Sequence, residues 1–276
     1  MKAALLQLNA SDDPAANLPV TLDLVAQAAG LGAQFVLTPE VTNCVSQNRA
    51  QQSAVLQHED ADITLAGLRR AAILHGVWLS IGSLALKTDD PDGRFANRSF
   101  LIDPAGQIVA RYDKIHMFDV TVSETERYRE SAGYRAGTRA VVADASFAML
   151  GLSICYDLRF AYLYRALAQS GAEMLLIPSA FSPVTGAAHW ESLLRARAIE
   201  TGCYVLAAAQ TGEHATTKGK PRRTYGHSMA ISPWGDVLVD MGTDPGVAVV
   251  DLDLKQVAES RKRIAALAHD RPFEGP

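Results

Sequence analysis

Cys155 is the residue of this chain whose position best suits covalent chemistry. It closes the apolar run at 148–154 and precedes Tyr156, where the chain turns toward a predicted helix. The N–H groups of such a turn point outward, so they can lower the pKa of a thiol and bind a developing oxyanion. The same position also suits a small buried residue at the end of a core strand, because free cysteines are among the most buried residues.

An ordinary thiol, with a pKa of about 8.5, is mostly protonated at neutral pH, so Cys155 needs a base or a cation beside it. Two other strand ends supply candidates. Glu40 follows the apolar strand predicted at 35–37, and Lys114 follows the strand predicted at 107–112. Three reactive side chains at three strand ends can meet at one edge of a sheet. A charged residue at a strand end is, however, more often simply solvated.

The other cysteines and the histidines show no metal-binding or disulfide pattern. Cys44 lies near Glu40, where it can line a pocket, and Cys203 lies in an apolar strand. The three cysteines include no C-x-x-C pair, and the seven histidines form no H-E-x-x-H motif. We therefore expect no metal, no cofactor and no disulfide framework, which favours a reducing compartment.

Ser228 offers a rival nucleophile. Residues 226–230, with the sequence GHSMA, nearly match the G-x-S-x-G elbow of serine hydrolases. That elbow requires a helix after the serine, whereas residues 233–235 (PWG) predict a turn between two strands. A hairpin is the favoured interpretation, and catalysis through Ser228 is kept as an alternative.

The elements that must position these residues alternate between short apolar runs and amphipathic stretches. Strands are predicted at 3–8, 35–37, 77–84, 99–103, 107–112, 147–155, 172–177, 204–209, 228–232, 236–240 and 247–252. Helices are predicted at 14–30, 61–75, 161–170, 188–201 and 255–264, and a long loop at 121–139. Strands occur both in hairpins and between helices, which predicts an α/β protein with mixed sheets, helices outside them and one domain over residues 1–276.

Composition excludes several classes of function. The 276 residues include 26 Lys+Arg and 30 Asp+Glu, a net charge of −4, and 48 % are hydrophobic, which is typical of globular proteins. Without a basic run, the chain offers no footprint for nucleic acid or for an anionic membrane. No stretch approaches the ~20 apolar residues of a membrane helix, and the first apolar run is too short for a signal peptide. We expect a cytoplasmic protein whose partners are small molecules or copies of itself.

Several motifs together resemble the nitrilase (carbon–nitrogen hydrolase) superfamily. Its three signatures are similar to TPE at 38–40, DKIHMFD at 113–119 and ICYDLRF at 154–160. Further matching segments are PSAF at 178–181, AHWE at 188–191, RARAIE at 195–200, YGHS at 225–228 and PWG at 233–235. The likeness runs from residue 2 to about 273 and is greatest to the amidase branch that includes ω-amidase and deaminated glutathione amidase. The departures, Ala187 and the pair at 161–162, lie at predicted helix starts.

This resemblance implies an α-β-β-α sandwich, in which two mixed sheets pack together, and a catalytic triad of Glu40, Lys114 and Cys155. Cys155 would attack an amide carbonyl to form a thioester while Glu40 moves the protons. Lys114 and the Tyr156 N–H would stabilise the oxyanion. Glu130 matches an auxiliary carboxylate of the family; the alternative is a solvated loop residue.

The expected substrate follows from charge. Arg159, near the start of the helix after the nucleophile, can hold a carboxylate through two hydrogen bonds, or it can pair with Asp157. By resemblance, Phe181 and Thr185 face the same pocket. We expect hydrolysis of the terminal amide of a 2-oxo acid, such as deaminated glutathione, to a carboxylate and ammonia.

Other interpretations stay open at this point. The enzyme could act on 2-oxoglutaramate or on N-carbamoyl amides, and a non-enzymatic metabolite-binding protein could use the same fold. The resemblance also implies a homodimer or a higher homo-oligomer, paired through the helix at 195–200 and the C-terminal segment.

Overall fold

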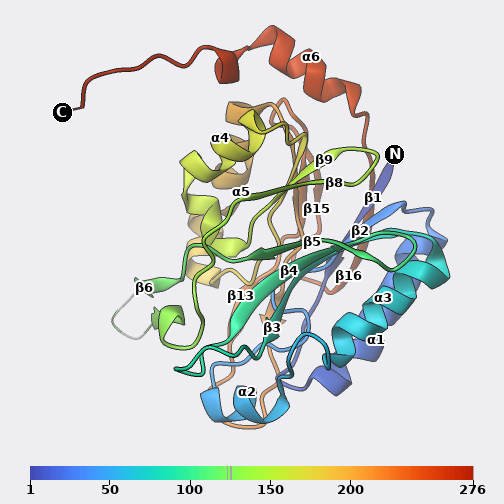
Figure 1. The fold of residues 1–276 in the computed structure, drawn as a ribbon, viewed down its shortest axis with the longest axis vertical. Coiled ribbons are helices and arrows are strands. Elements are labelled where there is room, and N and C mark those ends of the chain that lie inside the picture. The colour runs from blue at the N-terminus through green and yellow to red at the C-terminus, as the bar shows by residue number, and fades with distance from the viewer. Residues whose placement is uncertain (123, 125, 276) are drawn as a thin grey trace.

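The computed structural model describes residues 1–122, 124 and 126–275, and its elements form four layers (Figure 1). Two six-stranded sheets make up the inner layers, and helices cover their outer faces. Helices α1 (Pro14–Gly30) and α3 (Ile63–His75) pack on the first sheet. Helices α4 (Ala161–Gln169) and α5 (Pro183–Thr201) pack on the second. The predicted α-β-β-α sandwich with mixed sheets is confirmed.

Each sheet combines parallel and antiparallel pairs. The first sheet has the order β16 (Gly246–Asp251), β1 (Lys2–Gln7), β2 (Phe35–Leu37), β3 (Trp78–Leu86), β4 (Ala96–Ile102) and β5 (Ile108–Asp113). The second has the order β15 (Val237–Asp240), β14 (Met229–Ile231), β11 (Tyr204–Ala207), β10 (Met174–Leu176), β9 (Met149–Leu152) and β8 (Val141–Asp144). Strands β1, β2 and β3 pair in parallel, as do β9, β10 and β11. Their connections contain helices because parallel strands require a crossover.

Apolar side chains fill the spaces between the layers. Leu5 and Phe35 of the first sheet belong to the same buried cluster as Leu150 and Leu175 of the second, so the two sheets share one core. A separate cluster joins Val25 of α1 and residues of α3 to the outer face of the first sheet. The central strands, such as β1, β2, β10 and β11, are covered on both faces, which explains why they appear in the sequence as continuous apolar runs rather than alternating ones.

The ends of four strands bring the candidate residues to one edge of the sandwich. In the first sheet, β2 ends shortly before Glu40 and β5 ends next to Lys114. In the second, β9 ends shortly before Cys155 and β10 shortly before Phe181. The carboxyl ends of parallel strands lie at the same edge of a sheet, so β9 and β10 deliver their following residues to one place.

Several smaller elements surround this edge. They are α2 (Arg49–Val55), the hairpin of β6 (Asp119–Thr121) and β7 (Arg127–Arg129), the pair β12 (Thr211–Glu213) and β13 (Arg223–Tyr225), and 3₁₀ turns at Glu130–Ala132 and Cys155–Arg159. A further 3₁₀ turn at Ala266–Ala268 follows α6 and lies against α4 and α5. Helix α6 (Lys255–Arg263) runs along one end of the molecule (Figure 1). In the described part of the chain, no helix has the length and apolar character needed to cross a membrane.

The structure corrects several predicted boundaries. The loop predicted at 121–139 contains most of the β6–β7 hairpin and a 3₁₀ turn. The helix predicted at 188–201 begins at Pro183, because proline suits the first turn of a helix. The strand predicted at 147–155 ends at Leu152, and Cys155 starts a 3₁₀ turn instead. Strands β8, β12 and β13 and helix α2 were not predicted; α2 buries only Gln52, so it carries no apolar stripe.

Candidate active site

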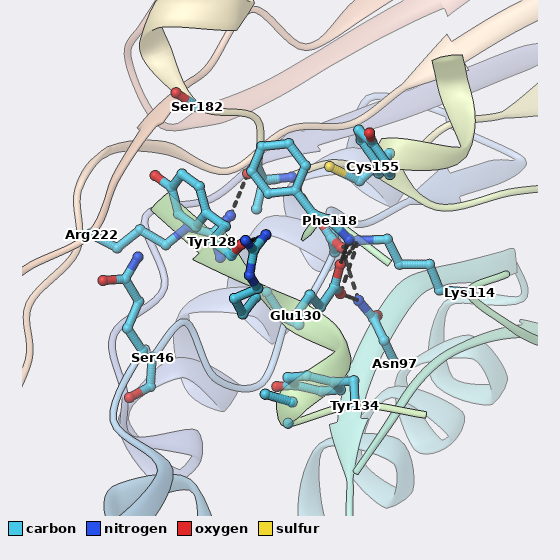
Figure 2. Close-up of a pocket in the computed structure, with 18 of the residues that line it drawn as sticks. Ser46, Asn97, Lys114, Phe118, Tyr128, Glu130, Tyr134, Cys155, Ser182 and Arg222 are labelled. Atoms are coloured by element: carbon cyan, nitrogen blue, oxygen red, sulfur yellow. Dashed lines mark hydrogen bonds and ion pairs between the residues drawn. The ribbon is translucent and has the colours of Figure 1, made fainter. Parts of the chain in front are cut away.

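Glu40, Lys114 and Cys155, predicted from three separate strand ends, line one cavity of about 560 Å³ (Figure 2). The ammonium Nζ of Lys114 lies 2.8 Å from Oε1 of Glu40 and 2.9 Å from Oε2 of Glu130. Glu40 is only 4 % exposed and Lys114 only 2 %, so neither is the solvated strand-end residue that was the alternative. The structure thus places a cation and two carboxylates together below the surface.

Cys155 has a backbone conformation that is unusual for a residue with a side chain. Its φ is +50°, and its N–H donates to the carbonyl oxygen of Pro178 at 2.9 Å. The carboxylate of Asp157 supports the turn by accepting hydrogen bonds from the Ile154 N–H and from the Tyr112 hydroxyl of the first sheet. Strained conformations of this kind persist when the surroundings hold them, and they cluster at functional sites.

The loop that carries Glu40 lies against the second sheet's loop at Pro178. Gly82 of β3 makes this approach possible. A Cβ at Gly82 would lie 2.0 Å from the Thr38 carbonyl oxygen and 2.4 Å from Cβ of Pro178. Only glycine fits between these two loops, so residue 82 permits the close approach of the Glu40 loop to the Pro178 loop, whose carbonyl accepts from the Cys155 N–H.

The Glu40 carboxylate is held ionised. It accepts hydrogen bonds from the Asn97 side-chain amide at 2.8 Å and from the Ala180 N–H at 2.9 Å. Burial alone would raise the pKa of Glu40, but the positive charges of Lys114 and Arg222 outweigh it and hold the pKa below its ordinary value. The opposite balance applies to Lys114. Burial lowers its pKa, and the charges of Glu130 and Glu40 raise it well above its ordinary value.

Burial and the neighbouring Glu40 charge raise the pKa of Cys155, and Lys114 only partly opposes them. The turn was expected to lower this pKa, and that expectation is wrong for the free site because the thiol is buried beside a carboxylate. At neutral pH the site therefore holds a protonated thiol next to an ionised Glu40. This arrangement can pass a proton from sulfur to carboxylate when an electrophile arrives.

Glu130 belongs to the same charged cluster. Both of its oxygens lie within hydrogen-bonding distance of Lys114 Nζ, at 2.9 and 3.0 Å. Its Oε2 also accepts from the Phe118 N–H at 2.6 Å. The solvated-loop alternative for Glu130 does not fit these contacts. Glu130 and Glu40 hold the Lys114 ammonium from two sides.

Three of the four remaining predicted residues line the cavity. These are Tyr156, Phe181 and Thr185. Arg159 does not line it. Its guanidinium carbon lies 5.4 Å from the ring centre of Phe181 and 5.9 Å from that of Tyr156, and its Nη1 lies 3.3 Å from Nδ1 of His189. Among the described residues, Arg159 forms no ion pair with Asp157 either, so it stands beside the two aromatic side chains that border the cavity.

Other residues that no sequence pattern indicated also line the cavity, and Asn97 and Arg222 matter most among them. Asn97 is a buried polar residue of β4, but it precedes Arg98 and Ser99 and lies before the strand predicted at 99–103, so no apolar run marked it as unusual. Arg222 lies just before β13, in a polar segment that carries no motif, so nothing in the sequence singled it out.

The other candidate nucleophiles, Ser228, Cys44 and Cys203, are buried. Ser228 is fully buried; its hydroxyl donates to Oε1 of Gln7 and accepts from the Ala209 N–H, which ties the two sheets together. Cys44 lines the cavity, but burial together with nearby aspartates raises its pKa to about 12. Cys203 is buried beside Arg261, away from the cavity. Within residues 1–122, 124 and 126–275, no group of three or more His, Cys, Asp or Glu side chains is arranged to hold a metal ion.

Comparison with known proteins places this geometry in a family. Residues 2–262 match the family described as carbon-nitrogen hydrolase. The chain belongs to this family. The hydrolase is 39 % identical to a deaminated glutathione amidase of Yersinia enterocolitica, over 97 % of this chain and 92 % of that one. It is 37 % identical to a deaminated glutathione amidase of Mus musculus, over 98 % of this chain and 83 % of that one.

Solved structures show the same fold. The C. elegans NitFhit protein superposes on the hydrolase with a TM-score of 0.89 at 35 % identity, over 98 % of this chain, which spans 65 % of the NitFhit chain. An amidase from Nesterenkonia sp. superposes with a TM-score of 0.77 at 28 % identity, over 96 % of this chain and 98 % of that one, in a variant that carries acrylamide on its active site cysteine. These likenesses confirm the superfamily resemblance, and the hydrolase acts on carbon–nitrogen bonds.

The lowered pKa of Glu40 leads to an expected pH profile. If the ionised carboxylate is the base, kcat/KM should stay constant as the pH falls to about 4.3, the ordinary pKa of glutamate, and decline only below it. The sign follows from the shift, because a carboxylate whose pKa is depressed keeps its charge to lower pH. Initial rates between pH 3.5 and 9, with circular dichroism to confirm folding, measure the profile. An acid limb centred near pH 6 would contradict the assignment.

Proposed function

We propose that this hydrolase is a thiol amidase in which Cys155, Glu40 and Lys114 form the catalytic triad. The observation that carries the proposal is the shared cavity, in which an ionised Glu40 and a charged Lys114 lie beside a buried, protonated thiol. An amide resists water because its carbonyl is weakly electrophilic and its amine leaves poorly. The three side chains address both problems.

In the first step, the Cys155 sulfur attacks the amide carbon while the thiol proton passes to Glu40. The carbonyl π electrons move onto oxygen and give a tetrahedral oxyanion. The Lys114 ammonium and the Tyr156 N–H are the proposed donors to this oxygen. The Tyr156 N–H donates to no backbone carbonyl among the described residues, so it is available. Loss of one such donor typically costs about 10²–10³-fold in rate.

In the second step, Glu40 gives its proton to the amide nitrogen, the carbon–nitrogen bond breaks, and the amine leaves a thioester on Cys155. Water then enters and Glu40 removes its proton as the water attacks the thioester carbon. Collapse of the second tetrahedral intermediate releases the carboxylic acid, and the sulfur recovers its proton from Glu40. Glu130 is proposed as a positioning residue, because it holds the Lys114 ammonium.

The proposed substrate is a 2-oxo acid with an ω-amide. Relatives named deaminated glutathione amidase support this class. Arg159 is proposed to bind the 2-oxo acid carboxylate from beside Tyr156 and Phe181, with Thr185 contributing a hydroxyl. An unsubstituted amide such as 2-oxoglutaramate would release ammonia. In deaminated glutathione the amide nitrogen belongs to cysteinylglycine, so the expectation of ammonia is wrong for that compound and the dipeptide would be released instead.

Two further parts of the proposal concern the protein as a whole. We propose a homodimer or higher homo-oligomer that pairs through the region of α5. Ile199 of α5 and Trp234 in the nearby β14–β15 turn are apolar residues left 54 % and 42 % exposed, which supports a contact there. We also propose a cytoplasmic location, on the basis of the cysteine pattern.

A substrate panel tests the proposed function. Purified protein is incubated with deaminated glutathione, 2-oxoglutaramate, an N-carbamoyl amino acid, an aliphatic nitrile and an amide of equal length without a carboxylate. Released acid and amine are quantified by mass spectrometry. We expect the two 2-oxo acid amides to be hydrolysed at least about 100-fold more efficiently than the amide without a carboxylate, as expected when a buried charged hydrogen bond is lost. Equal rates on both would contradict the substrate class.

Arg159→Lys is the variant that tests the carboxylate contact. Lysine keeps the charge but cannot make the paired hydrogen bonds of a guanidinium, so kcat/KM for 2-oxoglutaramate should fall about 10- to 100-fold. Steady-state kinetics should show most of that loss as a rise in KM. The kcat/KM for the amide without a carboxylate should be the same in Arg159→Lys and in the unsubstituted protein. Arg165→Lys, on the outer helix α4, is the matched control. Unchanged kinetics in Arg159→Lys would remove the residue from the site.

A further inference from the structure

Arg222 is a half-buried arginine that lines the cavity and has no role in the proposed mechanism. It enters the cavity from the side opposite to Lys114 in Figure 2, beside Tyr128. Its Nη2 donates to the Ala180 carbonyl oxygen at 2.6 Å, which fixes the guanidinium in place. Its charge reaches into the site, because it helps to lower the pKa of Glu40.

The guanidinium of Arg222 is incompletely satisfied. Its Nε is buried and has no hydrogen-bond partner, and in the described part of the chain no carboxylate lies within 4.0 Å of it. Buried N–H groups without partners are costly, so each one in a folded protein calls for an explanation. The guanidinium as a whole lines the cavity and has no carboxylate partner there, so a negatively charged ligand in the cavity would supply one.

The other charged groups of the cavity are engaged or exposed. Arg49 donates to the carbonyls of Gly93 and Gly133, while Arg127 and Arg129 are exposed at the rim. Glu40 and Glu130 are held by Lys114. Glu126, which also lies near this end of the cavity, accepts from the hydroxyls of Tyr128 and Ser182. Arg222 is thus the half-buried cation best placed to meet an incoming anion.

The position of Arg222 identifies which part of a substrate it would meet. In the proposed mechanism Glu40 gives its proton to the leaving amine, so the amine departs past Glu40. Arg222 adjoins this side, because it bonds to the carbonyl of Ala180 while Glu40 accepts from the N–H of the same residue. Arg159 lies elsewhere, beside Tyr156 and Phe181.

We propose that Arg222 binds a carboxylate on the leaving amine, and this proposal rests on the proposed function. The substrate class is then an N-substituted ω-amide with an anionic group at each end, whose amine is an amino acid or a short peptide. The cavity of about 560 Å³ lies within the ~300–1,000 Å³ range of pockets that enclose drug-sized ligands, so it has room for such a molecule.

Two synthetic substrates isolate this contact. One is 2-oxoglutarate amide-linked through its ω-carboxyl to glycine, and the other is the same compound made with glycinamide, which removes only the distal charge. The quantity measured is the ratio of their kcat/KM values, with 2-oxoglutarate as the common product. In the unsubstituted protein we expect the glycine compound to be favoured at least about 10-fold, as for a charge-assisted hydrogen bond.

Arg222→Gln should reduce this ratio about 10-fold or more, and Arg222→Lys should reduce it less. The ratio cancels any general effect of the lost charge on Glu40. Arg223→Gln is the matched control, because Arg223 is the exposed neighbour outside the cavity and should leave the ratio unchanged. Should Arg222→Gln fail to fold, Arg222→Lys and the ratio in the unsubstituted protein still decide the matter.

The failure of this proposal differs from the failure of the proposed function. Hydrolysis of both compounds with a ratio near 1, or a ratio that Arg222→Gln does not change, overturns the leaving-group site and leaves the thiol amidase standing. Absence of hydrolysis of both compounds and of 2-oxoglutaramate overturns both proposals together.

Discussion

Cys155→Ala is expected to abolish amide hydrolysis, with a loss of at least about 10⁴-fold in kcat, while the protein stays folded. Alanine removes the sulfur that forms the bond to the acyl group, and no other nucleophile in the cavity can replace it. The other thiol that lines the cavity, Cys44, has its pKa raised to about 12 by burial and nearby aspartates. Product release measured by mass spectrometry, together with a thermal melt, gives both readouts.

A covalent intermediate is the more specific sign. Rapid quenching of the unsubstituted protein during turnover should reveal an intact mass increased by the acyl group, located on Cys155 by peptide mapping. Cys203→Ala serves as the control, because that thiol is buried away from the cavity and should leave the adduct unaffected. Full activity in Cys155→Ala would discard the mechanism. Inhibition by a fluorophosphonate but not by iodoacetamide would instead favour Ser228.

Lys114→Met is expected to damage both stability and catalysis. Methionine approximates the length of the side chain but leaves Glu40 and Glu130 buried without their cation. Breaking a buried ion pair by removal of one partner costs about 3–5 kcal/mol of the free energy of unfolding. Loss of an oxyanion donor costs a further ~10²–10³-fold in kcat. Urea unfolding followed by circular dichroism, and initial rates, measure the two effects.

The stability loss in Lys114→Met has a predictable pH dependence. In the unsubstituted protein the depressed pKa of Glu40 contributes stability that is present at neutral pH and lost as the pH falls through that pKa. Without Lys114, burial dominates and raises the pKa of this carboxyl, so protonation becomes stabilising at low pH. The difference in unfolding free energy between the two proteins should therefore shrink from pH 7 to pH 4.5. Lys255→Met, at an exposed position on α6, should show no such difference.

The continuous apolar runs predicted an α/β protein with mixed sheets and outer helices, because the core strands are covered on both faces. The α-β-β-α sandwich itself was implied by the family resemblance. Two elements that were not predicted, α2 and the β6–β7 hairpin, lack such apolar runs. Helix α2 begins at a side-chain cap on Asn48 and buries only Gln52, so it lacks the apolar periodicity on which helix prediction depends. The two strands of the β6–β7 hairpin are only three residues long each, so their single apolar residues, Val120 and Tyr128, are too few to form a recognisable strand pattern.

The identity of the reactive residues in the candidate site was predictable, because each stands at the end of a strand. Glu40, Lys114 and Cys155 each follow an apolar run, and the family signatures connected them. Their protonation states were not predictable, because the pKa of Cys155 depends on how completely the folded chain buries it beside Glu40. Arg222 was also hidden, since its importance comes from its place in the folded cavity without a carboxylate partner rather than from any local pattern.

The reactive groups come from different halves of the sandwich, Glu40 and Lys114 from one sheet and Cys155 from the other. Neither sheet alone carries a complete triad, so hydrolysis requires both sheets to be packed together. A substitution at the sheet–sheet contact, such as one at Gly82, should therefore lower the rate even though every reactive side chain is kept.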